Sequence, residues 1–209
     1  MPSLDSFAVQ VFNDIRYDLL PPDVQLVVTN PMSAFISQVW LAIFLAFLLT
    51  LPLFIYKIVL YIRPALMPHE KKILLWIILP IALLFLSGAA YSYFFLVPIT
   101  FKVLYPYATV IGAVSLFSVE EFIYYISGLM VAVGFMFLLP LLMILLSTAR
   151  IIEVDFWKRG WRHAFVFFLV LSAIITPDGT GVTMILLFLP LAGLYLAGYF
   201  FANRLSRYV

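Results

Sequence analysis

Residues 123–146 read IYYISGLMVAVGFMFLLPLLMILL, a stretch without a single charged side chain. A helix of about 20 apolar residues is long enough to cross the hydrocarbon core of a bilayer, which is about 30 Å thick. Backbone polar groups find no water in that core, so a single segment crosses it as a helix. Residues 39–53, 73–90 and 182–201 are almost free of charge as well. No ten-residue stretch alternates as a membrane β-strand does, so an all-α membrane protein is predicted.

The overall composition agrees with a membrane protein. The 209 residues are 66% hydrophobic and 11% charged, whereas soluble domains are nearer half apolar and a quarter charged. The absence of cysteine excludes disulfides and thiolate metal sites. Residues 1–17 carry Asp5 and Asp14 and lack a basic start followed by an apolar core. No cleavable signal peptide is therefore expected, and the first span would serve as its own insertion signal.

Five spans with proline kinks are predicted, at about residues 37–61, 73–97, 122–146, 161–176 and 182–201. The fourth is short, since its apolar part would form a helix of only about 18 Å, which a tilted neighbour or thinner bilayer can accommodate. The distribution of lysine and arginine residues predicts that this segment crosses the membrane. With five crossings, one side of the membrane receives Lys57, Arg63, Lys71, Lys72, Arg150, Lys158, Arg159, Arg162, Arg204 and Arg207. The positive-inside rule makes this side cytoplasmic, so the N-terminus is predicted outside and the C-terminus cytoplasmic.

The chain is divided into an external amphipathic segment, residues 1–36, and a single transmembrane helical domain, residues 37–209. Apolar residues at positions 4, 7, 8, 11, 12 and 15 follow helical spacing, with polar residues opposite them, which predicts an amphipathic helix lying in the membrane interface. Pro21 and Pro22 end this helix, and residues 25–29 are read as a short extended piece.

Local signals place the ends and bends of the spans. The second span is expected to end near residue 97, with a loop running past residue 106. Ser118 and Glu121 have the spacing of a capping box that opens the third span. Four prolines within spans each remove a helical hydrogen bond and bend the axis: Pro52, Pro80, Pro140 and Pro190. A turn over residues 176–181 precedes the last span, whose start Asp178 or Thr180 would cap.

The connection between the first two spans contains the most informative charge. Glu70 is the only acid between Lys57 and Lys72, among four cations. One interpretation is an interfacial carboxylate paired with Lys71 or Lys72. The other is a carboxylate kept to receive a cationic partner, for which a guanidinium is suited because it binds carboxylates in a two-pronged fork.

The chain resembles the TatC family of twin-arginine translocase proteins over residues 8–203. The matching motifs are, in order, Leu51-Pro52-Leu-Phe-Ile-Tyr56, Pro64-Ala-Leu66, His69-Glu70 with two following cations, Val97-Pro98, Ser118-Val119, and Ile175-Thr-Pro-Asp178 with the later Pro190. Each motif is short, and their order and spacing together make the resemblance specific.

The resemblance implies a receptor and scaffold protein that binds twin-arginine signal peptides of folded proteins for export. Glu70 would bind the paired arginines, and the residues that shape its site would be Tyr61, Arg63, Pro64, His69 and Lys72. Pro52, Asp178 and Pro190 would have structural or contact roles. The implied partners are folded passenger proteins, single-span TatA- and TatB-type subunits, further copies of the chain and the bilayer. The implied place is the cell membrane, and the energy source the proton motive force.

Two departures from the family pattern are visible. The family has six helices, and the matching part of this chain begins where the first of them ends. The family also commonly places glutamates in its fourth and sixth helices, where this chain has Leu138 and Leu196. The polar intramembrane site of the family is therefore expected to be absent.

Other classes of function receive little support. Apart from Lys57, the spans other than the fourth contain no Asp, Glu, Lys, Arg or His, which argues against the alternative of a small-molecule transporter. His69 and His163 are both expected in loops, so they would not face one another within the bundle as the two ligands of a haem must, and a zinc site needs three or four ligands. Nucleotide-binding and hydrolase motifs are missing, and a lipid enzyme would rest only on Glu153, Asp155 and His163, read as a solvated face. No enzymatic activity, cofactor, metal or nucleic-acid partner is expected.

Overall fold

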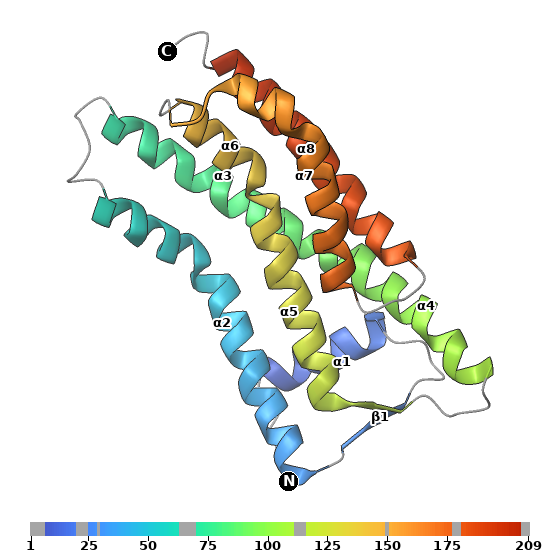
Figure 1. The fold of residues 1–209 in the computed structure, drawn as a ribbon. Helices are drawn as coiled ribbons and strands as arrows, with labels where there is room; N and C mark the ends of the chain where they lie inside the picture. Colours follow the sequence, from blue (N-terminus) through green and yellow to red (C-terminus); the bar gives the residue numbers. More distant parts are fainter. Residues whose placement is uncertain are drawn as a thin grey trace.

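A computed structural model describes residues 7–19, 25–28, 30–62, 70–110, 116–148, 151–176 and 181–205 (Figure 1). In chain order the elements are α1 (Phe7–Leu19), β1 (Gln25–Val27), α2 (Pro31–Ile62), α3 (Glu70–Tyr91), the π-helical turn η2 (Ser92–Leu96), α4 (Val97–Val110), β2 (Leu116–Ser118), α5 (Val119–Phe137), α6 (Leu139–Thr148), α7 (Val154–Ile175) and α8 (Val182–Leu205). The long helices lie side by side and form one bundle.

Four helical stretches of the described residues are long and apolar enough to cross a membrane: Met32–Lys57, Leu79–Leu104, Val119–Thr148 and Val182–Arg204. They coincide with four of the five predicted spans, and the chain is a multi-pass helical membrane protein. The fourth predicted span is the C-terminal part of α7. The whole helix is 22 residues long, about 33 Å, and its apolar part makes up about 18 Å of this length. It packs along α8. Its crossing and the orientation of the termini remain predictions.

The loop predicted after residue 97 is wrong, because the helix continues as α4 to Val110. Pro98 is the reason that a break was expected, since its ring crowds the carbonyl four residues earlier. The π-helical turn η2, just before Pro98, avoids this clash. In η2 the Val97 N–H donates to the carbonyl of Ser92, five residues back, and this wider turn makes room for the proline.

Pro140 interrupts the third span, as predicted. The helix breaks at Leu138, whose N–H donates to the Phe135 carbonyl at 3.1 Å, and α6 begins at the next residue. Pro52, Pro80 and Pro190 lie inside continuous helices instead.

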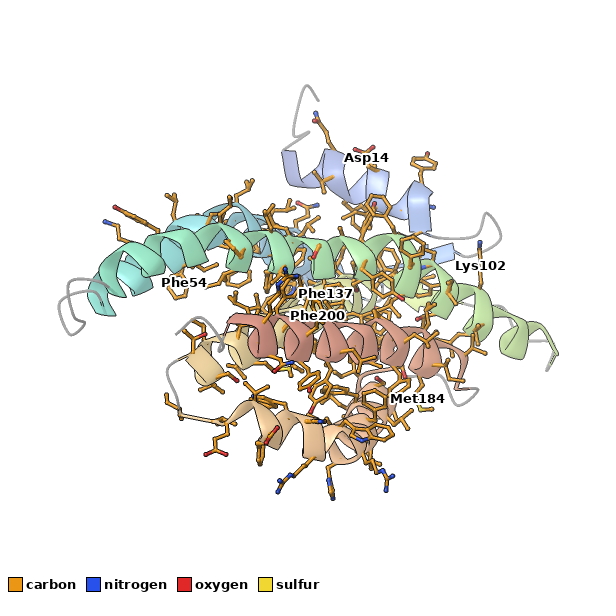
Figure 2. The ribbon with its side chains drawn as sticks, turned by 90° about the horizontal axis from the view of Figure 1, so that it is seen from above. Asp14, Phe54, Lys102, Phe137, Met184 and Phe200 are labelled. Atoms are coloured by element: carbon orange, nitrogen blue, oxygen red, sulfur yellow. The ribbon has the colours of Figure 1, made fainter. Side chains whose placement is uncertain are left out.

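The N-terminal amphipathic helix is confirmed over Phe7–Leu19. Its apolar face is covered by protein: Ile15 and Leu19 are 7% and 5% exposed and belong to the main core, whereas Asp14 lies on the exposed side (Figure 2). The predicted division at residue 36 falls inside α2, which begins at Pro31.

A two-stranded parallel sheet joins the extended piece to the start of α5. Gln25, Leu26 and Val27 pair with Leu116, Phe117 and Ser118, so the all-α prediction omitted one small sheet. Ser118 is the residue before α5, as the capping box predicts, but its side chain makes no capping hydrogen bond.

Glycines allow two close helix crossings. A Cβ atom at Gly134 of α5 would lie 2.8 Å from the Phe85 ring of α3, and one at Gly198 of α8 would lie 2.8 Å from the Cα of Pro140. Small residues of this kind let helix backbones approach closely in membranes. The bundle therefore consists of two tightly joined groups, α2–α3–α5 and α6–α7–α8.

A tyrosine compensates for the proline in α8. Pro190 has no N–H for the carbonyl of Leu186, four residues earlier. The Tyr91 hydroxyl, from α3, donates to this carbonyl at 2.7 Å. Neighbouring helices satisfy backbone groups freed by proline in this way inside membranes.

Replacing Tyr91 with phenylalanine is expected to lower the free energy of unfolding by about 1 kcal/mol, because the Leu186 carbonyl loses this donor. Unfolding in detergent micelles, followed by tryptophan fluorescence, measures the change. In a Pro190→Ala background the restored N–H serves the carbonyl, so the same replacement should have a smaller effect. Equal losses in both backgrounds would contradict the assignment.

Candidate functional site

The candidate site lies where α2 and α3 are connected. Tyr61 is in the last turn of α2, and Glu70 is the first residue of α3, with Lys72 in the same turn. The first N–H groups of a helix have no intrahelical partner, and the helix dipole favours an anion there. Position 70 is therefore a favourable place for a carboxylate. Arg63, Pro64 and His69 lie outside the described residues.

This end of the bundle carries the exposed cations of the later helices. The C-terminal end of α2 and the start of α3 lie at the same end of the bundle as the start of α7 and the C-terminal end of α8 (Figure 1). Exposed here are Lys57, Lys158, Arg159, Arg162 and Arg204. Lys102 lies on α4 toward the opposite end (Figure 2). Five of the ten cations predicted to share one side therefore lie at this end of the described part of the chain.

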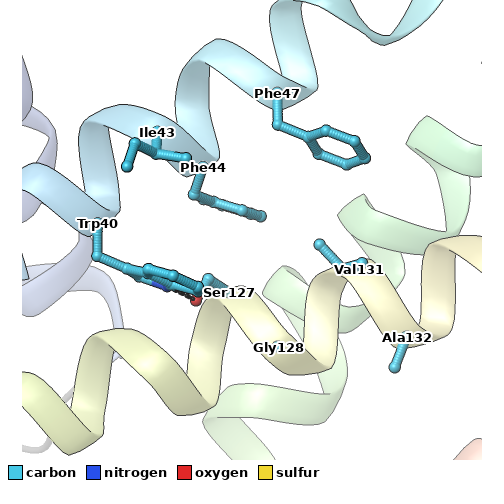
Figure 3. Close-up of a pocket in the computed structure, with 8 residues that line it drawn as sticks. All are labelled: Trp40, Ile43, Phe44, Phe47, Ser127, Gly128, Val131 and Ala132. Carbon is cyan, nitrogen blue, oxygen red and sulfur yellow. Dashed lines mark hydrogen bonds between the residues drawn. The ribbon is translucent and has the colours of Figure 1, made fainter.

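An apolar groove opens between α2 and α5 (Figure 3). It has a volume of about 440 Å³ and is lined by Trp40, Ile43, Phe44, Phe47, Ser127, Gly128, Val131 and Ala132. Its one strongly polar contact is internal. The Trp40 indole Nε1–H donates to the Ser127 Oγ at 2.9 Å, and that hydroxyl donates to the Ile123 carbonyl at 2.7 Å. The groove therefore presents hydrocarbon to whatever lies in it.

This groove was not predicted from the sequence, although its residues have a recognisable spacing. Trp40, Ile43, Phe44 and Phe47 have the spacing of one helix face, and Gly128 and Ala132 are small residues one turn apart on α5. Neither helix alone indicates that the two faces meet.

The other positions taken from the family pattern are spread over the bundle. Pro52 and Pro190 are half-buried within α2 and α8, and Asp178 lies outside the described residues. Leu138 packs beside the small cluster of Leu51, Phe85 and Ala89, whereas Leu196 is 54% exposed on α8. Within the described ranges, no three His, Asp or Glu side chains are grouped to hold a metal ion.

The sequence matches the family described as Sec-independent protein translocase protein (TatC) over residues 4–190. The chain belongs to the TatC family. The resemblance drawn from the ordered motifs is confirmed. The motif residues that the structure describes lie on separate elements: residues 51–56 within α2, Val97 and Pro98 at the start of α4, Ser118 and Val119 at the start of α5, and Pro190 within α8.

Relatives from different sources share most of this chain. TatC of Cenarchaeum symbiosum is 33% identical over 204 residues, which cover 98% of this chain and 77% of that protein. TatC of Aquifex aeolicus is 29% identical, with 96% and 84% covered. The chloroplastic TATC of Pisum sativum is 32% identical over 85% of this chain and 50% of that protein.

The TatC fold is confirmed by a solved structure. A crystal structure described as the twin-arginine translocase receptor TatC matches with a TM-score of 0.78 at 28% identity, covering 96% of this chain and 88% of that chain. The arrangement of helices predicted from the apolar runs is therefore that of a TatC protein.

Proposed function

We propose that this chain is the receptor subunit of a twin-arginine translocase in a cell membrane and binds the signal peptides of folded proteins at its α2–α3 end. The observation that carries the proposal is the membership of the TatC family, together with Glu70 at the start of α3. A carboxylate at a helix N-terminus accepts a guanidinium in a paired geometry. The exposed cations at the same end would disfavour basic ligands that lack such a contact.

The apolar part of a signal peptide would continue into the groove between α2 and α5. Phe47 is 15 residues before Ile62 on α2, a distance of about 22 Å along the helix. Signal peptides have an apolar region of about 7–15 residues after their basic start. The basic part could thus lie at Glu70 while the apolar part reaches the hydrocarbon surface beside Trp40 and Ile43.

We infer that single-span TatA- and TatB-type subunits and further copies of the chain complete the translocase around this receptor, and that the proton motive force drives export. No nucleotide-binding motif is present in the sequence. The family supports this function over the alternative of a small-molecule transporter, which would need polar or charged residues near the membrane midplane.

Site-specific photo-crosslinking in native membranes tests the receptor function. A photoreactive residue at position 70 should crosslink a twin-arginine peptide and not a twin-lysine control, because only the guanidinium matches the carboxylate site closely. A photoreactive residue at position 43 should crosslink the apolar part of the same peptide. If neither position distinguishes the two peptides, the receptor assignment is wrong for this chain.

A further inference from the structure

A second groove lies among α6, α7 and α8, away from the α2–α5 groove. It has a volume of about 580 Å³, and its wall includes Leu139, Leu142, Phe156, Gly160, His163 and Phe167. The polar groups at its base are already bonded. The Trp157 indole Nε1–H donates to the Ser147 Oγ at 2.9 Å, and the Tyr195 hydroxyl donates to the Trp157 carbonyl at 2.7 Å. What remains is a hydrocarbon surface with one imidazole at its edge.

A cluster of cations stands beside this groove. Arg159, Arg162 and His163 are all exposed and have the spacing i, i+3 and i+4, so they share one side of α7. Since His163 lines the groove, Arg159 lies one turn before it on the same side. Arg162 is stacked on Trp161, with its guanidinium carbon 5.4 Å from the ring centre.

No carboxylate of the described part of the chain is paired with these cations, although the Arg162 guanidinium lies over Trp161. The acids nearest in sequence are Glu153 and Asp155, both exposed at the start of α7, where the helix dipole favours them. No described carboxylate forms an ion pair with Arg159 or Arg162. The guanidinium groups are therefore available to an anion from outside the chain.

The position of the cluster along α7 fixes its depth in the membrane. Residues 164–175 carry no charge, so they can lie in hydrocarbon, while the arginines before them cannot without a large cost. Trp157 and Trp161 lie at the transition, as tryptophans commonly do at membrane–water interfaces. With α7 crossing the membrane as the sequence predicts, the cluster is level with lipid headgroups, and the groove continues from it toward the acyl chains.

We propose that this groove binds an anionic phospholipid, with an acyl chain against Leu142, Gly160 and Phe167, the phosphate held by Arg159 and His163, and Arg162 adding positive charge nearby. Basic pockets between membrane helices on the cytoplasmic side bind anionic headgroups in this way. The positive charge of the cluster favours an anionic lipid over a single-span apolar helix, because such a helix has no fixed negative charge to place beside the cations. The proposal is independent of signal-peptide binding at Glu70.

The test uses the full chain reconstituted in vesicles of equal phosphatidylglycerol and phosphatidylcholine. After mild extraction, native mass spectrometry measures which lipids remain bound. The double replacement R159Q/R162Q should lower the retained ratio of phosphatidylglycerol to phosphatidylcholine about tenfold, since each cation contributes to anionic-lipid binding. Gly160→Leu fills the groove without changing charge, and a Cβ there meets no atom within 4 Å; it should lower phosphatidylglycerol retention as well.

Arg204→Gln is the matched control, since it removes an exposed cation at the same end of the bundle but on α8. It should leave the ratio unchanged, and free glycerol phosphate should not displace the lipid. The proposal is overturned if Arg204→Gln lowers the ratio equally, if glycerol phosphate displaces the lipid, or if Gly160→Leu has no effect on retention. It is also overturned if Gly160→Leu reduces capture of a single-span membrane protein while lipid retention stays the same.

Discussion

Replacing Glu70 with glutamine is expected to weaken the binding of a twin-arginine signal peptide by at least about tenfold. Glutamine keeps the size of the side chain but removes the charge, and a hydrogen bond to a charged group contributes about 1.5–3 kcal/mol. The position at the start of α3 adds a dipole that favours a carboxylate and not an amide. Titration of fluorescent peptide into the reconstituted chain measures the dissociation constant.

Two comparisons make this expectation specific to Glu70. Glu153→Gln removes an exposed carboxylate from the same end of the bundle and should leave the affinity unchanged. A twin-lysine peptide should lose much less affinity than the twin-arginine peptide on Glu70→Gln, because an ammonium group makes no forked contact. Unchanged twin-arginine binding by Glu70→Gln, or an equal loss by Glu153→Gln, would remove Glu70 from the site.

Replacing Gly134 with leucine is expected to destabilise the protein by about 3 kcal/mol, or to prevent folding. The new Cβ would lie 2.8 Å from Cε2 of Phe85. That ring is 1% exposed and packs edge-on against Phe47 and Phe135, with ring centres 6.2 and 5.3 Å away. It has little room to move, and overpacked cores typically lose about 1–3 kcal/mol.

Gly128 provides the matched control on the same helix. It is exposed, and an added Cβ meets no atom within 4 Å, so Gly128→Leu should be neutral or slightly stabilising, because leucine favours helix by roughly 0.5–1 kcal/mol over glycine. Unfolding of both variants in the same detergent gives the comparison. If Phe85 is the obstacle, Phe85→Leu should recover part of the loss in Gly134→Leu. Equal losses at positions 128 and 134 would show that the close α3–α5 crossing does not determine the effect.

Hydrophobicity predicted the main helices because a membrane span needs one continuous apolar run, which is visible in neighbouring residues of the sequence. The runs at 39–53 and 123–146 correspond to α2 and to α5 with α6, and Pro140 breaks the third span where the sequence places it. The prediction failed where the outcome depends on contacts between distant segments. The short extended piece at residues 25–29 was predicted and contains β1, but its pairing with β2 was not, because the two segments are about 90 residues apart in the sequence.

The candidate site divides in the same way. The motif around Glu70 is contiguous in sequence, so its residues could be named without a fold. The two grooves are not contiguous. The first needs Trp40 of α2 to meet Ser127 of α5, and the second needs three helices around Trp157. Hydropathy along the chain does not predict which helices meet at these grooves, because the packing of their side chains determines those contacts.

The π-helical turn between α3 and α4 sets the phase of the helix that passes through it. Ala89 and Val97 are 3% and 0% exposed. Eight residues of regular α-helix turn through about 800°, which would leave Val97 about 80° out of line with Ala89. The π-helical turn holds one extra residue, so the eight residues rotate only about as far as seven residues of α-helix, roughly 700°. Val97 then lies about 20° from the direction of Ala89 instead of about 80°. The continuous helix can therefore bury Phe85 and Ala89 against one set of neighbours and also bury Val97 and Phe101 near its other end. A regular α-helix could do this only if it were divided into two helices with different rotations.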